Sequence, residues 1–296
     1  MMRQLYSVPE KKRIRVFVDT DAACEVDDPF AIAHALMSPK LEVKGILSEH
    51  FAQPDSEAAS YREIENILAL MGLTGQVPLY HGAEKPLTAP DKWQECPAAD
   101  AIIQEALLED ERPLMVLCQG AVTNLACALL KRPEIASRLT CIWIGGSAYP
   151  VGGWEFNMNN DIHAANVLFA SGMELWQVPK ECYTSMQVGY AELLTKVAPC
   201  GKLGAYLCEN LMAFGASPQG AWSPGESWVL GDSPAVGLAL HTPLTGFEMR
   251  EAPQVNADCT YRLNTGLRPV RVWHQVNVRF ILEDFFAKLQ LWTQGK

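Results

Sequence analysis

The regular alternation of short apolar stretches with amphipathic ones, from residue 13 to residue 178, most constrains the fold of this chain. Stretches rich in β-branched residues, such as 13–19 (RIRVFVD) and 41–47 (LEVKGIL), predict buried strands. Apolar residues at helical spacing follow them, at 28–37 and 55–71. Strands that alternate with helices of this length form βαβ units. We therefore expect an α/β fold with an open, mostly parallel sheet and helices on both faces.

The same alternation predicts the middle of the chain. We expect strands at 77–80, 114–118, 139–144 and 174–178, and helices at 98–108, 124–130 and 162–169. After Pro179 the pattern becomes less regular, with a helical region at 191–213 that Pro199 and Gly201 interrupt, a Gly/Pro/Trp-rich loop at 215–226, short strands at 257–262 and 270–276, and a closing helix at 282–292. Since no repeat or linker composition divides the chain, we expect one domain over residues 1–296.

Charge and composition exclude several classes of function. The formal net charge is −10, and no basic run is longer than residues 11–13, which argues against nucleic acid as the main partner. No apolar run reaches the ~18–20 residues of a membrane span, and no apolar stretch typical of a secretory signal follows the first charges. The nine cysteines include no CxxC pair, which argues against disulfides and zinc. We expect a cytoplasmic protein that binds neither membranes nor nucleic acid.

An acidic cluster follows the first expected strand. Residues 19–28 read DTDAACEVDD, with five carboxylates within ten residues and no lysine or arginine among them. Capping of the next helix explains one or two of these acids, because helix N-termini favour Asp. Like charges this close raise one another's pKa unless a cation compensates them. A hard divalent cation such as Ca²⁺, which prefers six to eight oxygen ligands, does so directly.

Four motifs resemble those of one enzyme family. Residues 19–28 are similar to the D-x-D-x-x-x-D-D signature of the inosine–uridine type nucleoside hydrolases, and residues 120–126 (GAVTNLA) to their G-x-L-T-N-[IL]-A turn. Residues 154–165 (WEFNMNNDIHAA) resemble E-F-N-x-x-x-D-P-x-A-A, and residues 231–236 (GDSPAV) resemble H-D-P-x-A-V. The chain is identified as a divergent member with a D-T-D-A-x-x-E-x-D-D signature. The resemblance implies a Rossmann-like fold and cleavage of N-glycosidic bonds.

The resemblance also implies roles at a metal site. One Ca²⁺ would be held by Asp21, Asp28, Asp232 and the backbone carbonyl of Gln119. Asp27 would be the general base that takes a proton from a metal-activated water.

Substrate contacts follow from the same resemblance. Asp19 would lie beside the metal ligands, and Glu155 and Asn157 would hydrogen-bond the ribose hydroxyl groups. These contacts strengthen as the sugar becomes oxocarbenium-like, and the implied reaction is direct displacement by water at the anomeric carbon. The partner implied is a small nucleoside or related N-riboside, and the assembly a homodimer or homotetramer.

Three departures from the family pattern bear on mechanism. Five residues separate Asp21 from Asp27, where the family has three, and we expect Glu25 in this longer loop to line the pocket. Gly231 stands where many members have a histidine that assists the leaving base. Residues 149–153 lack the asparagine that usually reaches the 5′ end of the sugar, so the natural substrate need not be a common ribonucleoside.

The missing histidine requires another source of help for the leaving base. A stacked aromatic ring is one route, and we expect at most two of four candidates to lie in the pocket: Tyr149, Trp154, Trp222 and Trp228. His50, which with Glu49 follows the second expected strand, is another. We expect His241 to end a helix instead of serving the base, and His34 to be a core residue.

Three hypotheses about function remain open at this point. The first is a Ca²⁺-dependent hydrolase of nucleosides or related N-ribosides. The second is a catalytically silent nucleoside- or sugar-binding protein on the same scaffold. The third is a phosphatase-like hydrolase that uses the acidic cluster with Mg²⁺, although the chain shows no clear basic clamp for phosphate.

Overall fold

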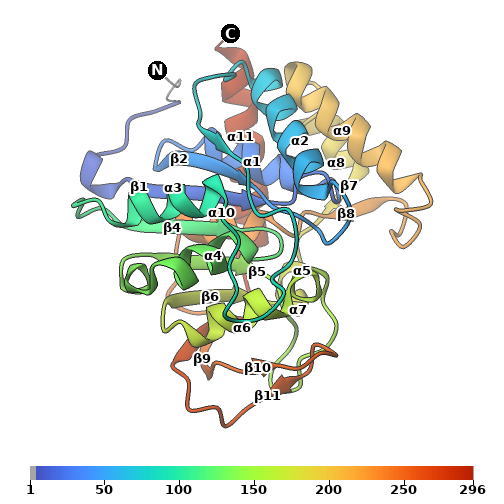
Figure 1. Ribbon diagram of the computed structural model, residues 1–296. Helices are drawn as coiled ribbons and strands as arrows, with labels where there is room; N and C mark the ends of the chain where they lie inside the picture. Colours follow the sequence, from blue (N-terminus) through green and yellow to red (C-terminus); the bar gives the residue numbers. More distant parts are fainter. Residues whose placement is uncertain (1–4, 296) are drawn as a thin grey trace.

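The computed structural model, which describes residues 5–295, is built on an eight-stranded sheet (Figure 1). The strand order is β3-β2-β1-β4-β5-β6-β12-β9. The strands are β1 (Ile14–Thr20), β2 (Leu41–Ser48), β3 (Leu79–Tyr80), β4 (Leu114–Cys118), β5 (Thr140–Ile144), β6 (Glu174–Val178), β9 (Phe247–Glu251) and β12 (Pro269–Trp273). Every neighbouring pair is parallel except β12 with β9. The expected mostly parallel α/β sheet is confirmed.

Helices cover both faces of the sheet, and its central strands are therefore buried on both sides. In β1, Val16 and Val18 belong to one buried cluster and Phe17 belongs to the other, as the alternation of side chains along a strand requires. The first cluster lies under α1 (Asp28–Leu36), α2 (Ser56–Met71), α8 (Tyr190–Lys196), α9 (Gly201–Gly215), α10 (Ser233–Leu240) and α11 (Val278–Gln294). The second lies under α3 (Pro97–Ala106), α4 (Thr123–Lys131) and α6 (Ile162–Ala170).

Several short elements were not expected from the sequence. They are α5 (Phe156–Asn160), α7 (Lys180–Tyr183), the antiparallel pair β7 (Gln187–Gly189) and β8 (Ser227–Val229), strand β10 (Gln254–Val255), and the 3₁₀ turns Glu10–Lys12 and Pro133–Ser137. Strand β11 (Tyr261–Arg262), the antiparallel partner of β10, lies within the strand expected at 257–262. Segments this short carry no readable periodicity. Edge strand β9 was also missed, because three of the five residues of Phe247–Glu251 are charged and the segment has no buried apolar run. In residues 5–295 no helix is both long and apolar enough to cross a membrane.

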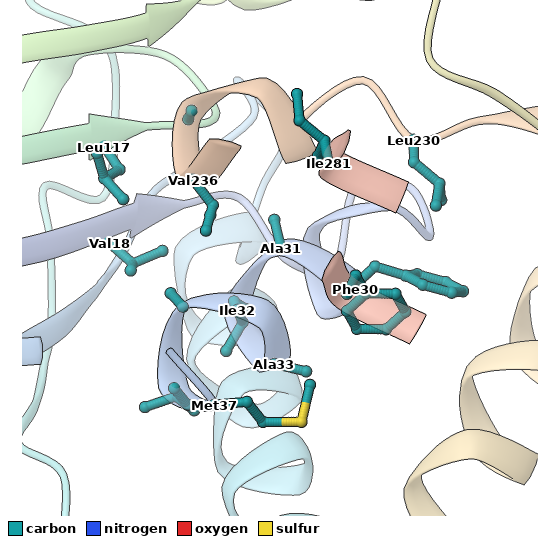
Figure 2. Close-up of a cluster of buried hydrophobic side chains, with 14 of the residues drawn as sticks. Val18, Phe30, Ala31, Ile32, Ala33, Met37, Leu117, Leu230, Val236 and Ile281 are labelled. Atoms are coloured by element: carbon teal, nitrogen blue, oxygen red, sulfur yellow. The ribbon is translucent and has the colours of Figure 1, made fainter. Parts of the chain in front are cut away.

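Helices α1 and α10 pack beside each other against the centre of the sheet (Figure 2). Val236 of α10 and Val18 of β1 contribute to the buried cluster around α1, together with Ile281 of α11. Helix α11 packs closely against α10 at Gly237, because a Cβ at that position would lie 2.4 Å from Cγ1 of Ile281. Both α1 and α10 have proline in the first turn, which suits a helix start. The packing brings their N-termini, and the acids that precede them, to the same end of the sheet.

The aromatic contact beneath α1 provides a test of this arrangement. Phe30 is fully buried, and its ring centroid lies 5.6 Å from that of Phe285 in α11. We predict that Phe30→Ala lowers the free energy of unfolding by about 3–5 kcal/mol, the range for a large cavity in a packed core. Urea denaturation followed by circular dichroism measures this. Leu244→Ala, at a side chain that is 95% exposed, is the control and should change little; equal effects of the two substitutions would contradict the packing described.

Candidate functional site

A pocket of about 440 Å³ lies at the carboxyl ends of the central strands, where open α/β sheets bind their ligands. It is lined by residues that the sequence singled out: Asp21, Glu25, Asp27, Asp28, Gln119, Trp154, Glu155, Asn157, Trp222, Gly231 and Asp232. A larger hollow of about 930 Å³ borders α4, α6 and β10, but no carboxylate lines it. The smaller, acidic pocket therefore has the chemistry of the candidate site.

The floor of the pocket joins acids from distant parts of the chain. Asp27 and Asp28 stand at the start of α1, and Asp232 stands at the start of α10. One carboxylate oxygen from each lies within 4.8 Å of the others. The backbone N–H of Asp232 donates to Oδ2 of Asp27 at 3.2 Å, and the hydroxyl of Thr20 donates to Asp28. The packing of α1 against α10 thus builds the cluster.

Burial shifts the proton affinities of these acids. It raises the pKa of Asp27 to about 6, and raises that of Asp28 to about 7 with the charge of Asp27 as the second cause. Burial, followed by the charges of neighbouring acids, raises the pKa values of Asp21 and Asp232 well above the usual range. Glu25, at the side of the pocket, has its pKa raised to about 8 for the same reasons. The protein itself provides little positive charge here to offset the repulsion.

The donor atoms of this floor fit a hard divalent cation. Oδ2 of Asp21 is buried and has no hydrogen-bond partner among the described residues. The backbone carbonyl of Gln119 lies 3.4 Å from Nδ2 of Asn157, which lines the same pocket. Carboxylate and carbonyl oxygens are the ligands that Ca²⁺ prefers. Asp21, Asp28, Asp232 and the Gln119 carbonyl could hold such an ion, and an oxygen of Asp27 lies within 4.8 Å of those of Asp28 and Asp232.

Glu155 and Asn157 form one wall, and both are already held in place. Glu155 is the N-cap of α5, and its carboxylate accepts from the backbone N–H groups of Gly146 (2.8 Å), Met158 (2.9 Å) and Asn157 (3.2 Å). The hydroxyl of Tyr183 donates to its Oε1 at 3.0 Å. Four donors fill the acceptor positions of a carboxylate. The orientation of Glu155 is therefore fixed, and Asn157 and Tyr183 line the pocket beside it.

Three residues predicted to contact substrate do not line the pocket. Asp19 is buried on the opposite face of β1 from Thr20, where its Oδ1 accepts from Nδ2 of Asn124 at 2.8 Å. His50 is fully buried, and its Nε2 lies 2.8 Å from the hydroxyl of Thr123. Burial lowers the pKa of this histidine to about 4. These two residues support the strand ends from behind the pocket.

Trp228 is the third of these residues. Its indole is buried and packs 4.8 Å, between ring centroids, from that of Trp222. Trp222 is the ring that lines the pocket, together with Trp154. The alternation along the short strand β8 turns Trp228 into the core, so of the four aromatic candidates two reach the pocket, and Tyr149 packs against Tyr261 instead.

Sequence reasoning missed Tyr183 and Lys180, which also line the pocket. A Cβ at Gly231 would lie 3.1 Å from Cδ2 of Tyr183 and 3.3 Å from Oδ2 of Asp27. The tyrosine ring and the Asp27 carboxylate thus leave little room for a side chain at position 231. Their position is the signal that could have indicated them: residues 180–184 begin two residues after the end of β6, at the edge of the sheet where ligands bind.

Comparison with known sequences identifies a family. The sequence model described as inosine-uridine preferring nucleoside hydrolase matches residues 16–285. The pyrimidine-specific ribonucleoside hydrolase RihA of Escherichia coli O81 (strain ED1a) is 32% identical over 245 residues, which cover 74% of each chain. RihA of Escherichia fergusonii is 31% identical, again over 74% of each chain.

Solved structures share the fold. A purine-preferring ribonucleoside hydrolase from Gardnerella vaginalis superposes with a TM-score of 0.78 at 22% identity, over 95% of this chain and 100% of that one. An inosine-guanosine nucleoside hydrolase superposes with a TM-score of 0.73 at 19% identity, over 95% and 99% of the two chains. At these identities the likeness concerns the fold.

The acidic floor predicts how pH and metal affect stability. Because the folded-state pKa values of Asp27 and Asp28 lie near 6 and 7, above the ordinary 3.8, the folded metal-free protein binds protons more tightly than the unfolded chain. The contribution of these groups to stability is therefore present below about pH 4 and is lost as the pH rises through about 7. We predict that the unfolding temperature of EDTA-treated protein falls by several degrees between about pH 5 and pH 8. Ca²⁺ should restore it mainly at the higher pH.

Thermal denaturation followed by circular dichroism measures both effects. Asp28→Asn removes one of the raised groups, so this variant should lose less stability between the two pH values and respond less to Ca²⁺. A Ca²⁺-induced shift of the same size at both pH values, or no shift at either, would contradict the account.

Proposed function

We propose that this chain, which belongs to the inosine-uridine preferring nucleoside hydrolase family, cleaves the N-glycosidic bond of a nucleoside with Asp27 as the general base and Ca²⁺ as its cofactor. Hydrolysis of the N-glycosidic bond follows from the family. The observation that supports the assignment to these residues is the convergence of Asp27, Asp28 and Asp232, whose carboxylate oxygens lie within 4.8 Å of one another.

The proposed metal ligands are the carboxylates of Asp21, Asp28 and Asp232 and the backbone carbonyl of Gln119. The unpartnered, buried Oδ2 of Asp21 and the raised pKa of Asp232 support this set, since both reflect negative charge without compensation. A bound Ca²⁺ supplies a positive charge that lowers the pKa of water beside it. It also offsets the repulsion among the acids that hold it.

Asp27 takes the proton from the attacking water. Burial raises its pKa only to about 6, so the carboxylate is mostly ionised at neutral pH and can accept a proton. The backbone N–H of Asp232 holds its Oδ2 at 3.2 Å, which fixes the direction of the carboxylate. The water oxygen bonds to C1′ of the sugar, the C1′–N bond breaks, and its electron pair leaves with the base.

The wall of Glu155 and Asn157 holds the ribose. Nδ2 of Asn157 lies 2.9 Å from the carbonyl of Ile144, so its amide is fixed before substrate arrives. Glu155 is fixed by its N-cap role and acts on the sugar together with the Tyr183 hydroxyl. A preorganised hydrogen-bonding wall favours the flattened, positively charged sugar of the transition state.

Substrate preference, cellular location and assembly are proposed from the relatives and from the composition. Pyrimidine ribonucleosides are the first substrates to test, because the RihA proteins that are 31–32% identical are pyrimidine-specific. A cytoplasmic location accords with nine cysteines that are all free in the structure. A homodimer or homotetramer is the proposed assembly, which sedimentation analysis would test.

Replacement of the proposed base tests the mechanism. We predict that Asp27→Asn lowers kcat by about 10²–10⁴-fold, because the amide cannot accept the proton of water. Release of reducing sugar from uridine, cytidine and inosine in the presence of Ca²⁺ measures the activity. The control is Asp91→Asn, an exposed acid far along the chain from the cluster, which should keep full activity.

Unchanged circular dichroism would show that the Asp27→Asn variant is folded. Wild-type activity in that variant would overturn the role of Asp27. A folded wild-type protein that binds Ca²⁺ and ribonucleosides without cleaving them would support a silent binding protein.

A further inference from the structure

The mouth of the pocket differs in chemistry from its acidic floor. The indoles of Trp154 and Trp222 are each 57% exposed, whereas the floor acids Asp27, Asp28 and Asp232 are buried. Nζ of Lys180, another exposed residue, lies 5.5 Å from the ring centroid of Trp154. If the sugar lies against the floor, as the proposed function requires, the base lies at this mouth. Flat indoles suit the face of a nucleobase.

Two hydroxyl groups of the pocket, those of Tyr183 and Thr184, are not free to assist the leaving base. Gly231 has no side chain, and Tyr183 packs against it. Burial, followed by the negative charge of Glu155, raises the pKa of the Tyr183 phenol, which makes it a poor acid. The hydroxyl of Thr184 donates to the backbone carbonyl of Lys180 at 2.7 Å. These two hydroxyl groups are therefore engaged within the protein.

Lys180 is placed to act on the base. It is the first residue of α7, two residues after the end of β6, and its backbone N–H donates to the carbonyl of Gly146 at 3.0 Å. Among the described residues that line the pocket, it is the one lysine or arginine beside six carboxylates. No described carboxylate lies within ion-pairing distance of its ammonium group, which leaves that group available to a ligand.

We propose that Lys180 contacts the departing base and that the preferred substrates are N-ribosides whose base carries an oxo group beside the glycosidic nitrogen, as uracil does. When the C1′–N bond breaks, its electron pair is shared between that nitrogen and the neighbouring oxygen. The ammonium group of Lys180 donates a hydrogen bond to this oxygen and stabilises the negative charge. The base anion takes up a proton from water as it leaves, which balances the proton that Asp27 took from the attacking water and returns to solvent.

This assignment deepens the proposed function and rests on it. An exocyclic amino group beside the glycosidic nitrogen would oppose the ammonium, because both are donors. The ammonium of Lys180 lies over the ring of Trp154, 5.5 Å from its centroid, which places it beside a base that enters between the two indoles.

Two variants of Lys180 separate charge from packing. Lys180→Met keeps an unbranched apolar stem over Trp154 and removes the charge, whereas Lys180→Arg keeps the charge. Lys202→Met, on an exposed residue of α9, is the matched control. Two substrates separate leaving-group help from the rest of catalysis: uridine, and 4-nitrophenyl β-D-ribofuranoside, whose leaving group departs readily as an anion.

We expect Lys180→Met to lower kcat/KM for uridine by about 10- to 100-fold, less than the 10²–10³ typical of an enclosed oxyanion donor, because the mouth is open to water. The same variant should change kcat/KM for the nitrophenyl riboside by about twofold or less. Lys180→Arg should recover most of the uridine activity, and Lys202→Met should behave as wild type. Uracil binding, measured by quenching of tryptophan fluorescence, should also weaken in Lys180→Met, but by less than uridine hydrolysis, because neutral uracil lacks the negative charge of the departing base.

Equal losses on both substrates, or none on uridine, would overturn the role of Lys180 and leave the proposed function intact. A wild-type enzyme that cleaves neither substrate would overturn both. Unchanged uracil affinity in Lys180→Met would also count against contact with the base, whatever the rates.

Discussion

The rest of this site depends on the mutual repulsion of buried carboxylates at the N-termini of two helices. Close packing of α1, α10 and α11 brings Asp28 and Asp232 together, although they lie 204 positions apart in the sequence. Their pKa values are raised by burial first, and neighbouring negative charges contribute next. A fold that holds such groups together stores an electrostatic cost, and a divalent cation offsets it. Binding at the proposed metal site is therefore expected to stabilise the fold.

The absence of a side chain at Gly231 makes room for the ring of Tyr183. The hydroxyl of Tyr183 in turn donates to Glu155 at 3.0 Å. The tyrosine thus tightens the wall of Glu155 and Asn157 beside Gly231. The chemistry of the leaving base is then moved outward, to the exposed indoles and the ammonium of Lys180 at the mouth.

The sequence predicted the sheet and most of the floor of the pocket for identifiable reasons. Strands such as β4 and β6 have the bounds expected from their apolar runs, since burial on both faces makes such runs continuous. The acids of residues 19–28 form a local cluster that is readable without a structure. Asp232 was found through a motif, because no local pattern shows that a residue so far along the chain returns to the first strand.

The errors have physical reasons as well. Whether a residue faces the pocket or the opposite face depends on the phase of the strand near its end, which placed Asp19 behind the floor and Trp228 in the core. Tyr183 and Lys180 lie in a four-residue helix that is too short for any periodicity to announce. Their importance comes from contacts with Glu155 and Trp154, which belong to a different loop.

The central claim is that water, activated at this acidic floor, displaces the base directly from C1′. Hydrolysis of uridine with Ca²⁺, followed by ¹H NMR of the ribose anomer that forms first, measures it directly. The account predicts that α-ribose forms first, because a single displacement by water inverts the configuration at C1′, and that cleavage stops after the metal is removed. β-Ribose as the first product, or undiminished cleavage without a divalent cation, would contradict it.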